Sequence, residues 1–507
     1  MRKLSLFAAT ALFALSPVFA QTSPVPSPDG PSAPIAPALP AQAQDPALLQ
    51  KVQAILAAAP AGTRFGLLVE TLDGKPVISI APDQRFMPAS NTKVFTTAAT
   101  YARLPALQAS AQGTGVRLER GSHGLNNVVI EGRGDPDLSS AADCTQDCLA
   151  TLADAIAART RHVGDIIGDD TFYPDDRWSP GMSWNNMPFT WGTGISALTL
   201  DNNEFALTVT PGAVAKLPRV AGDGYFTLQN DAQTVAGDKS DIGLWRMPGS
   251  RVLRISGTVA AGAKPDVVHL GIDDPAEYAA FRFKQLLEAR GVKVRGRVLT
   301  RHRPLSPLDD PETRGDAPVP ATPQLPMLAQ LPAPSLAEDV HLTNKVSQNL
   351  HAELMMRRLG KIVGSGSIAD GEVQLTQTLT EAGVPQGGYY FADGSGMSSY
   401  NRVTPRTTVT LLRWIVKQPW SAAWRASLPL GGEDGTLGRR FRDTPLDGKI
   451  SAKTGSINAS RALSGYMPGA SGQTLVLSIF ANDIPPKGER AAIAAMDASL
   501  LAIAAAN

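Results

Sequence analysis

The sequence predicts an α+β fold that is interrupted by a long insertion. Residues 65–69 and 76–80 are apolar-rich strand candidates, and Asp73-Gly74 between them is typical of a hairpin turn. Three more strand candidates lie near the C-terminus, at residues 449–456, 462–467 and 474–481. An alanine-rich helix candidate follows them at residues 489–505. From about residue 107 to residue 325 the sequence changes to short β-rich runs broken by Gly, Pro and Asp, which predicts inserted domains.

The first 20 residues have the features of a secretory signal peptide. Arg2-Lys3 forms the charged start, residues 4–15 are the apolar run, and Val18-Phe19-Ala20 is a small-residue cleavage site. Residues 21–46 are rich in Pro and Ala and too poor in large apolar side chains to form a core, so we expect a linker. No later stretch offers the roughly 18 apolar residues of a transmembrane span. We therefore expect a periplasmic protein without a transmembrane span.

Composition excludes several classes of partner and cofactor. The 507-residue chain has 47 Lys plus Arg against 46 Asp plus Glu and no long basic stripe, so we expect no nucleic-acid partner. Its two cysteines, Cys144 and Cys148, favour a local disulfide in an oxidising compartment. The nearest histidines, His123 and His162, show no metal-ligand spacing, so we expect neither a metal nor a cofactor. The oligomeric state stays open, and an oligomer is compatible with the sequence.

Ser90-Asn91-Thr92-Lys93 follows Pro88 at the start of a predicted helix. The spacing places a serine hydroxyl and a lysine amine one helical turn apart, which suits a serine nucleophile activated without histidine. Apolar residues at helical spacing bury one face of this helix; they are Val94, Phe95, Ala98, Ala99 and Tyr101.

Most elements predicted in the insertion are short strands, whereas the elements predicted directly after it are helices. Strands are predicted at 127–130, 205–209, 252–255 and 292–299, with a helix at 279–288 and a proline-rich return connection at 303–334. Helices are then predicted at residues 335–342 and 350–362. Ser347-Gln348-Asn349 lies on the turn between these two helices, and His351 is expected on the surface of the second helix. Lys453-Thr454-Gly455 lies on the first of the three C-terminal strands.

The order Ser-x-x-Lys, Ser-x-Asn, Lys-Thr-Gly resembles the three motifs of the penicillin-recognising serine enzymes. Ser-x-Asn occurs four times, starting at Ser183, Ser347, Ser399 and Ser456. Ser347 and Ser399 both lie between the other two motifs, so order alone does not choose between them. We prefer Ser347 because it lies on an inter-helix turn, whereas Ser399 closes a glycine-rich loop.

More of the chain resembles one branch of these enzymes, the class C low-molecular-mass penicillin-binding proteins, which are D-alanyl-D-alanine carboxypeptidases and endopeptidases. Ser90 and Ser347 lie roughly 250 residues apart, and this branch carries large inserted domains at that point. Five further short sequence segments resemble segments of this family: residues 132–138, 168–172, 393–398, 401–405 and 434–437.

The resemblance implies a β-lactamase/transpeptidase-like domain, a five-stranded antiparallel sheet covered by helices. We expect it to comprise residues 47–106 and 326–507, with the inserted β-rich domains at residues 107–325. Its implied ligands are peptidoglycan peptides that end in D-Ala-D-Ala, and β-lactam antibiotics.

The resemblance also implies a role for each site residue. Ser90 is the nucleophile and Lys93 its base, provided that burial and Lys453 lower the pKa of Lys93. Ser347 relays a proton from Lys93 to the leaving amine, and Asn349 holds Lys93 and the substrate amide. The remaining binding residues are Lys453 and Thr454 for the substrate carboxylate, Gly455 in the same motif, and Ser456, whose N–H would form an oxyanion hole with that of Ser90. Asp169 resembles an aspartate that faces the free amine of diaminopimelate in some relatives, although a turn cap is an equal reading.

The predicted function is a serine-type D-alanyl-D-alanine carboxypeptidase and DD-endopeptidase that acts on peptidoglycan through an acyl-enzyme on Ser90. One alternative is a β-lactamase or esterase on the same scaffold, which the large insertion disfavours. Another is a penicillin-binding scaffold protein without turnover, which the intact motifs disfavour.

Overall fold

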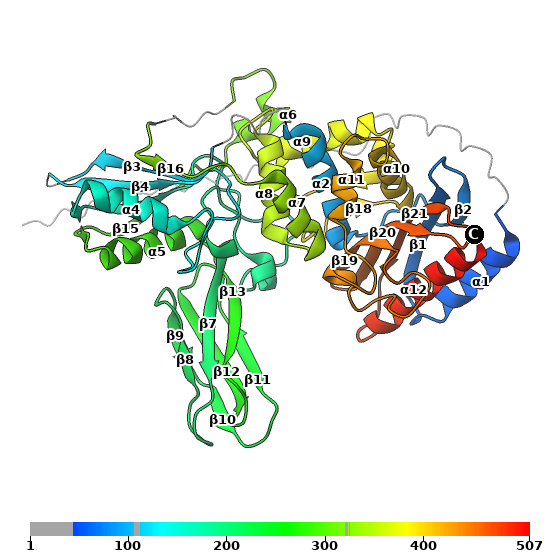
Figure 1. Ribbon diagram of the computed structural model, residues 1–507, viewed down its shortest axis with the longest axis horizontal. Helices are drawn as coiled ribbons and strands as arrows, with labels where there is room; N and C mark the ends of the chain where they lie inside the picture. The colour runs from blue at the N-terminus through cyan, green and yellow to red at the C-terminus, as the bar shows by residue number, and fades with distance from the viewer. Residues whose placement is uncertain (1–43, 106–111, 123, 320–322, 324) are drawn as a thin grey trace, which may run out of the picture. The chain divides into compact units, whose positions relative to one another are not determined.

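A five-stranded antiparallel sheet joins the two ends of the chain, in the order β19-β20-β21-β1-β2 (Figure 1). The computed structural model describes residues 44–105, 112–122, 124–319, 323 and 325–507. The predicted signal peptide and most of the predicted linker therefore lie outside the described residues. The strands are β1 (Arg64–Thr71), β2 (Pro76–Ile80), β19 (Ser451–Ile457), β20 (Ser460–Pro468) and β21 (Thr474–Asn482). The predicted hairpin and the three predicted C-terminal strands are confirmed.

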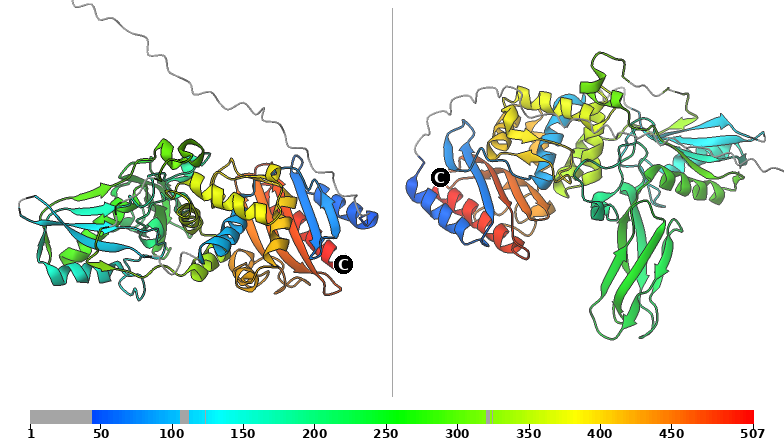
Figure 2. Two further views of the ribbon diagram at one scale, coloured as in Figure 1. Left: turned by 90° about the horizontal axis from the view of Figure 1, so that it is seen from above. Right: turned by 180° about the vertical axis from the view of Figure 1, so that it is seen from behind.

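One face of this sheet is covered by the first and last helices, α1 (Pro46–Ala57) and α12 (Glu489–Ala506), which lie side by side in Figures 1 and 2. Side chains alternate along β1, so Leu67 and Val69 are buried against these two helices while Leu68 is buried on the opposite face. The sheet thus has a separate hydrophobic core on each side. The sequence reasoning did not predict α1.

The opposite face is covered by a second group of helices, two of which begin within predicted motifs. They are α2 (Thr92–Arg103), α7 (Leu336–Lys345), α8 (Asn349–Gly360), α9 (Ile368–Glu381), α10 (Pro405–Ile415) and α11 (Ser421–Ala426). Phe95 of α2, Met355 of α8 and Leu412 of α10 share the buried core on this side of the sheet. The two short strands β17 (Tyr389–Tyr390) and β18 (Arg402–Val403) pair beside them. These contacts fix α2 and α8 against each other and against the sheet.

The insertion begins and ends in a mixed five-stranded sheet, in the order β15-β6-β4-β3-β16. Its strands are β3 (Gly115–Arg120), β4 (Asn126–Glu131), β6 (Ile166–Asp169), β15 (Val298–Arg301) and β16 (Ala329–Gln330). Two helices, α4 (Leu149–Arg159) and α5 (Pro275–Ala289), share its core. The predicted strand over residues 292–299 is instead two short strands, because β14 (Lys293–Val294) leaves this sheet to pair with β5 (His162–Val163).

The middle of the insertion consists of strands with short connections. A three-stranded sheet contains β7 (Glu204–Thr210), β8 (Arg219–Ala221) and β13 (Asp266–Gly271). A four-stranded sheet contains β9 (Thr227–Asn230), β10 (Gln233–Val235), β11 (Asp241–Trp245) and β12 (Val252–Ala260). Phe205 and Ile255, one from each sheet, are buried in a common core. The insertion is therefore largely β, as expected, with α4 and α5 on its mixed sheet.

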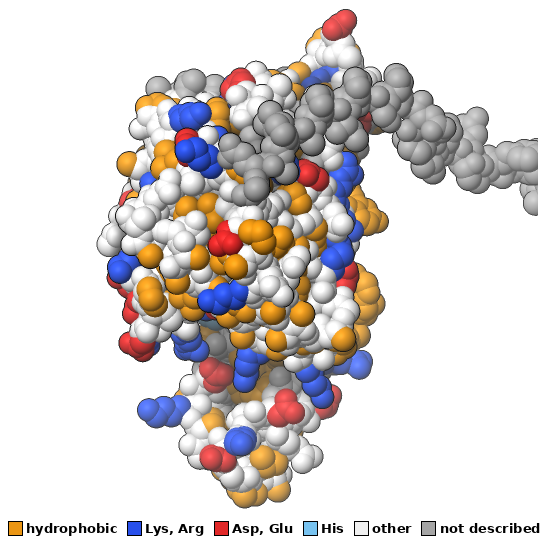
Figure 3. Space-filling model, turned by 90° about the vertical axis from the view of Figure 1, so that its right-hand side faces the viewer, with side chains coloured by type: hydrophobic (Ala, Val, Ile, Leu, Met, Phe, Trp, Pro, Cys, Tyr) orange, Lys and Arg blue, Asp and Glu red, His pale blue; other side chains and the backbone are white. Residues whose placement is uncertain are grey.

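Short helical turns and one disulfide complete the described chain. The turns are η1 (Ala89–Asn91), η2 (Trp184–Asn186), η3 (Thr190–Gly192), η4 (Asp201–Asn203), η5 (Pro307–Asp309), α6 (Pro311–Arg314), η6 (Gln386–Gly388) and η7 (Gly435–Leu437). Cys144 and Cys148 form the predicted disulfide immediately before α4. Every helix of the described residues is too short or too polar to cross a lipid bilayer. Lys and Arg side chains are interspersed with Asp and Glu on the face shown in Figure 3.

Candidate active site

Ser90 lies in the 3₁₀ turn η1, and α2 begins only at Thr92. Ala89, the residue before Ser90, has a left-handed backbone with φ of 50°, a conformation that is strained for a residue with a Cβ atom and is found often at functional sites. The Asn91 side chain donates a hydrogen bond to the Lys453 carbonyl over 2.9 Å, which ties this turn to β19. This bond holds the Ser90 turn beside β19.

The Lys93 amine is fully buried and has three hydrogen-bond partners. Its Nζ lies 2.9 Å from Ser90 Oγ, 2.6 Å from Asn349 Oδ1 and 2.7 Å from the Ser395 carbonyl oxygen. Burial lowers the pKa of Lys93 to about 7, against the opposing effect of the Asp393 and Glu353 carboxylates. A substantial fraction of this amine is therefore neutral near pH 7 and can accept a proton.

The three partners fix where that proton can come from. The Asn349 and Ser395 oxygens are carbonyl oxygens, which only accept hydrogen bonds, whereas the Ser90 hydroxyl can either donate or accept. A neutral amine therefore donates its two hydrogens to the carbonyl oxygens and directs its lone pair at Ser90. This arrangement suits removal of the Ser90 proton by Lys93.

The Ser347-Gln348-Asn349 turn lies between α7 and α8, as the sequence predicts. The Asn349 Nδ2 donates to the Trp191 carbonyl oxygen over 2.8 Å, and this bond orients the amide so that its oxygen faces Lys93. Trp191 belongs to the insertion, and no sequence pattern indicated that its backbone would reach this turn. The insertion therefore contributes directly to the arrangement around Lys93.

Lys453 is the second buried lysine of the site, and it contacts Ser347. Its Nζ donates to Ser347 Oγ over 2.9 Å and to the Thr454 carbonyl oxygen over 3.0 Å. Burial, followed by repulsion from Lys93, lowers the pKa of Lys453 well below its ordinary value. The hydroxyl of Ser347 is thus paired with Lys453, where the sequence reasoning had placed it as a relay from Lys93.

The Lys453-Thr454-Gly455 motif lies on β19, which is an edge strand of the sheet. A Cβ atom on Gly455 would lie 2.5 Å from the Pro88 carbonyl oxygen and 3.1 Å from the Asn91 nitrogen, so glycine lets β19 approach the Ser90 turn. Ser456, the next residue along β19, is exposed. Thr454 Oγ lies 2.6 Å from Thr436 Oγ, which brings a second hydroxyl to this edge. Thr436 lies in one of the segments that resemble the family, although the sequence reasoning did not assign it to the site.

The glycine-rich loop 393–398 packs against the Ser90 turn. Gly396 has φ of 89°, and a Cβ atom there would lie 1.9 Å from the Ala89 carbonyl oxygen. The same loop provides the Ser395 carbonyl that contacts Lys93. The loop therefore belongs to the wall of the site, and the sequence indicated it by its glycines and by its resemblance to a segment of the family.

The serines of two other Ser-x-Asn triplets, Ser183 and Ser399, form hydrogen bonds with residues of the insertion. Ser399 Oγ donates to the Gly181 carbonyl oxygen over 2.8 Å, and Ser183 Oγ donates to the Asn185 side chain over 2.6 Å. Ser347, whose hydroxyl contacts Lys453, is therefore the Ser-x-Asn serine that this hydrogen bond places at the site.

Asp169 lies at the end of β6, inside the inserted sheet. Its carboxylate accepts hydrogen bonds from Arg117 over 3.3 Å, Arg301 over 3.1 Å and the Thr171 hydroxyl over 2.7 Å. The Thr171 contact is the local cap that the sequence offered as the second reading of this residue. These contacts hold the Asp169 carboxylate within the insertion, and its contact with a substrate amine stays a prediction.

One group of the described residues has the spacing of a metal site: Asp170, Asp175 and His302. Hydrogen bonds from His302 to Asp170 and Asp274 raise the pKa of His302 to about 10, so the ring is protonated at neutral pH. The Arg177 side chain donates to Asp175 over 2.7 Å and lies 3.1 Å from the His302 ring nitrogen. A protonated imidazole beside a guanidinium is an ion-pair network and does not fit a cation.

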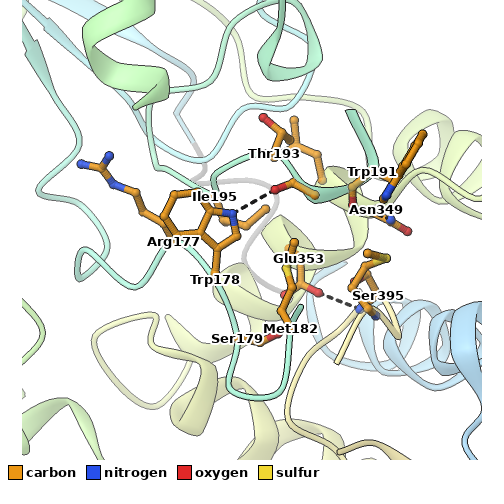
Figure 4. A pocket seen from close by; sticks show the side chains of 13 residues that line it. Arg177, Trp178, Ser179, Met182, Trp191, Thr193, Ile195, Asn349, Glu353 and Ser395 are labelled. Atoms are coloured by element: carbon orange, nitrogen blue, oxygen red, sulfur yellow. Dashed lines mark hydrogen bonds between the residues drawn. The ribbon is translucent and has the colours of Figure 1, made fainter. Parts of the chain in front are cut away.

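A small pocket lies behind Asn349, where the insertion meets α8 and the loop 393–398 (Figure 4). Its lining includes Trp178, Met182, Trp191, Asn349 and Glu353. In Figure 4 the Glu353 side chain points toward the Ser395 backbone, with which it forms a hydrogen bond.

Comparison with known proteins gives matches over most of the chain. The model of the D-Ala-D-Ala carboxypeptidase 3 (S13) family matches residues 48–502. The D-alanyl-D-alanine carboxypeptidase of Actinomadura sp. (strain R39) is 32% identical over 458 residues, which are 87% of this chain and 79% of the relative. The D-alanyl-D-alanine carboxypeptidase DacB of Haemophilus influenzae is 24% identical over 464 residues, which are 87% of this chain and 91% of the relative.

The fold has a match among solved structures. Penicillin binding protein 4 (dacB) from Haemophilus influenzae superimposes with a TM-score of 0.71 at 21% identity, covering 89% of this chain and 97% of that one. This similarity supports the fold, including the long insertion.

Proposed function

The chain belongs to the D-Ala-D-Ala carboxypeptidase 3 (S13) family, and from this premise we propose that it hydrolyses peptidoglycan stem peptides as a serine D-alanyl-D-alanine carboxypeptidase. The observation that carries the proposal is the 2.9 Å contact between Ser90 Oγ and a buried Lys93 amine whose pKa is about 7. The matched family is one of carboxypeptidases, which does not favour the alternative of a β-lactamase or esterase.

Acylation follows from the groups around Ser90. Lys93 Nζ takes the hydroxyl proton while Ser90 Oγ bonds to the carbonyl carbon of the penultimate D-alanine. The negative charge that develops on the carbonyl oxygen would be held by the backbone N–H groups of Ser90 and Ser456. Lys453 and Thr454, with the adjacent Thr436 hydroxyl, would bind the terminal carboxylate of the peptide.

The second half of the reaction releases the products. The C–N bond breaks as the nitrogen of the departing D-alanine takes the hydroxyl proton of Ser347, which hydrogen-bonds to Lys453. The proton that Lys93 removed from Ser90 replaces it, so that Ser347 and Lys93 both return to their starting states. Water then hydrolyses the Ser90 ester and restores the free enzyme. When the leaving nitrogen belongs to a cross-linked peptide, the same steps constitute a DD-endopeptidase, which we include in the proposal.

The family and the sequence together suggest where the enzyme works and what inhibits it. The predicted signal peptide, the Cys144–Cys148 disulfide and a peptidoglycan substrate support a periplasmic location. A structure of the Haemophilus influenzae relative is described as complexed with a β-lactam. We expect β-lactams to acylate Ser90 here and to be released slowly.

Product analysis tests the proposed function. Purified protein should release D-alanine from pentapeptide-bearing muropeptides and cut cross-linked dimers, with products identified by mass spectrometry. Rapid turnover of penicillin without any muropeptide product would instead support the β-lactamase alternative. Stoichiometric penicillin binding without either reaction would support a scaffold protein.

The acylation rate should depend on pH through Lys93. Below its pKa the amine is protonated and has no lone pair, so the rate is lost as the pH falls through about 7 and reaches a plateau above it. The rate of acylation by a fluorescent penicillin, followed between about pH 5 and pH 9 around the titration range of this amine, measures this increase of the rate with pH, the rising limb of the pH profile. A rate that is independent of pH across that range would contradict Lys93 as the base.

A further inference from the structure

Glu353 is a buried carboxyl next to the site that the proposed reaction does not use. Its side chain is 6% exposed, and it lies on α8 four residues after Asn349. Residues four apart lie on the same face of a helix, so Glu353 and Asn349 both face α2 and the loop 393–398. A buried carboxyl is costly unless it has partners, so its position calls for a physical reason.

The partner of Glu353 is the peptide group that contacts Lys93. The Ser395 N–H donates to Glu353 Oε1 over 2.8 Å, and the Ser395 carbonyl accepts from Lys93 Nζ over 2.7 Å. Asn349 contacts Lys93 directly over 2.6 Å. Both carbonyl oxygens that accept from Lys93 are therefore held by α8, one directly and the other through Glu353.

Asp393, a second buried acid near Lys93, lies in the loop 393–398 and has different hydrogen-bond partners from Glu353. Its carboxylate accepts four hydrogen bonds, from the Gly396 and Ser398 backbone N–H groups and from the Asn401 and Ser179 side chains. These contacts fold the loop internally and join it to its neighbours. Glu353 supplies the link between the loop and the helix that carries Asn349.

We propose that Glu353 is a positioning residue, whose carboxylate aligns the Ser395 carbonyl with Lys93 and whose negative charge sets the pH range in which Lys93 acts as the base. The inference rests on the proposed function in taking Lys93 as that base. The charged groups around this pair are Asp393 from the loop, Arg357 from α8, and Lys453 from β19. Burial and the nearby Asp393 raise the pKa of Glu353 to about 7, so its charge changes in the same range in which Lys93 titrates.

The experiment compares charge removal with shortening of the side chain. Glu353→Gln keeps an oxygen for the Ser395 N–H and removes the charge that favours protonated Lys93. The rising limb of penicillin acylation should therefore move down by at least about half a pH unit, with a plateau within about threefold of wild type. Glu353→Asp keeps the charge, but its shorter side chain places the carboxylate farther from the Ser395 N–H. The rising limb should therefore stay at the same pH while the plateau rate of acylation falls at least about tenfold.

A control variant excludes a general effect of removing a carboxyl whose pKa is raised. Glu372 on α9 has a pKa that burial also raises to about 7, but its neighbours are Glu312 and Asp310. Glu372→Gln should reproduce the wild-type profile.

The outcomes separate the two proposals. A Glu353→Gln limb that superimposes on that of an active wild type overturns the claim that the Glu353 charge sets the pH range of Lys93, and leaves the proposed function intact. An unchanged rate in Glu353→Asp overturns the alignment of the Ser395 carbonyl by Glu353, and this test does not depend on whether Glu353→Gln folds. A wild type that no penicillin acylates and that releases no D-alanine overturns the proposed function, and with it this inference.

Discussion

Ser90→Ala should abolish both penicillin acylation and D-alanine release, by at least about 10⁴-fold, because it removes the hydroxyl that contacts Lys93 and forms the acyl-enzyme. The rest of the site stays in place, since Asn91 still bonds to Lys453 and Lys93 still contacts Asn349 and Ser395. Intact-protein mass spectrometry after incubation with penicillin measures the adduct, and muropeptide digestion measures turnover.

Ser399→Ala is the matched control for this change, because Ser399 begins the competing Ser-x-Asn triplet and its hydroxyl bonds to Gly181. It should keep a stoichiometric penicillin adduct. A penicillin adduct on the Ser90→Ala protein would rule out Ser90 as the nucleophile.

Lys93→Met should reduce acylation by about 10³-fold or more, because it removes the base while keeping a side chain of similar length. The rate that remains should lose the rising limb near pH 7, since the titrating amine is gone. Rates of fluorescent penicillin labelling across the pH range, together with the thermal midpoint of the folded variant, measure both effects.

Lys361→Met is the comparable change outside the site. Lys361 follows α8 and also has a lowered pKa through burial, and its amine lies over the Phe172 ring at 4.6 Å. At 1.5 Å per helical residue it is about 18 Å along α8 from Asn349, so its loss should leave the pH profile unchanged. A Lys93→Met protein that keeps the limb would assign the titration to another group.

The sheet and the three motifs could be predicted because their signals are local. Strand alternation and the Asp73-Gly74 turn predict β1 and β2, and helical spacing predicts α2 and α8. The resemblance of the ordered motifs to those of the family predicts that they form one site, and the Ser90–Lys93 and Ser347–Lys453 hydrogen bonds agree with that expectation.

The contacts made through backbone groups could not be predicted. The Trp191 and Ser395 carbonyls that position Asn349 and Lys93 depend on where two distant loops approach the site. Because every residue has a backbone carbonyl, the sequence does not indicate which carbonyl will form such a contact. His351 was expected on a helix surface but is fully buried, because Asp339 and Asn202 from two other segments bond to its ring nitrogens. Such long-range partners are a property of the folded chain.

The bond between Asn349 and the Trp191 carbonyl bears on attempts to make a minimal version of this enzyme. Excising the insertion to leave a compact sheet-and-helix core would remove the acceptor that orients the Asn349 amide. The amide could then rotate and turn its NH₂ group toward Lys93, where an acceptor is needed. The insertion is therefore not a detachable module, and a trimmed version would need a replacement acceptor at this position before it could match the parent.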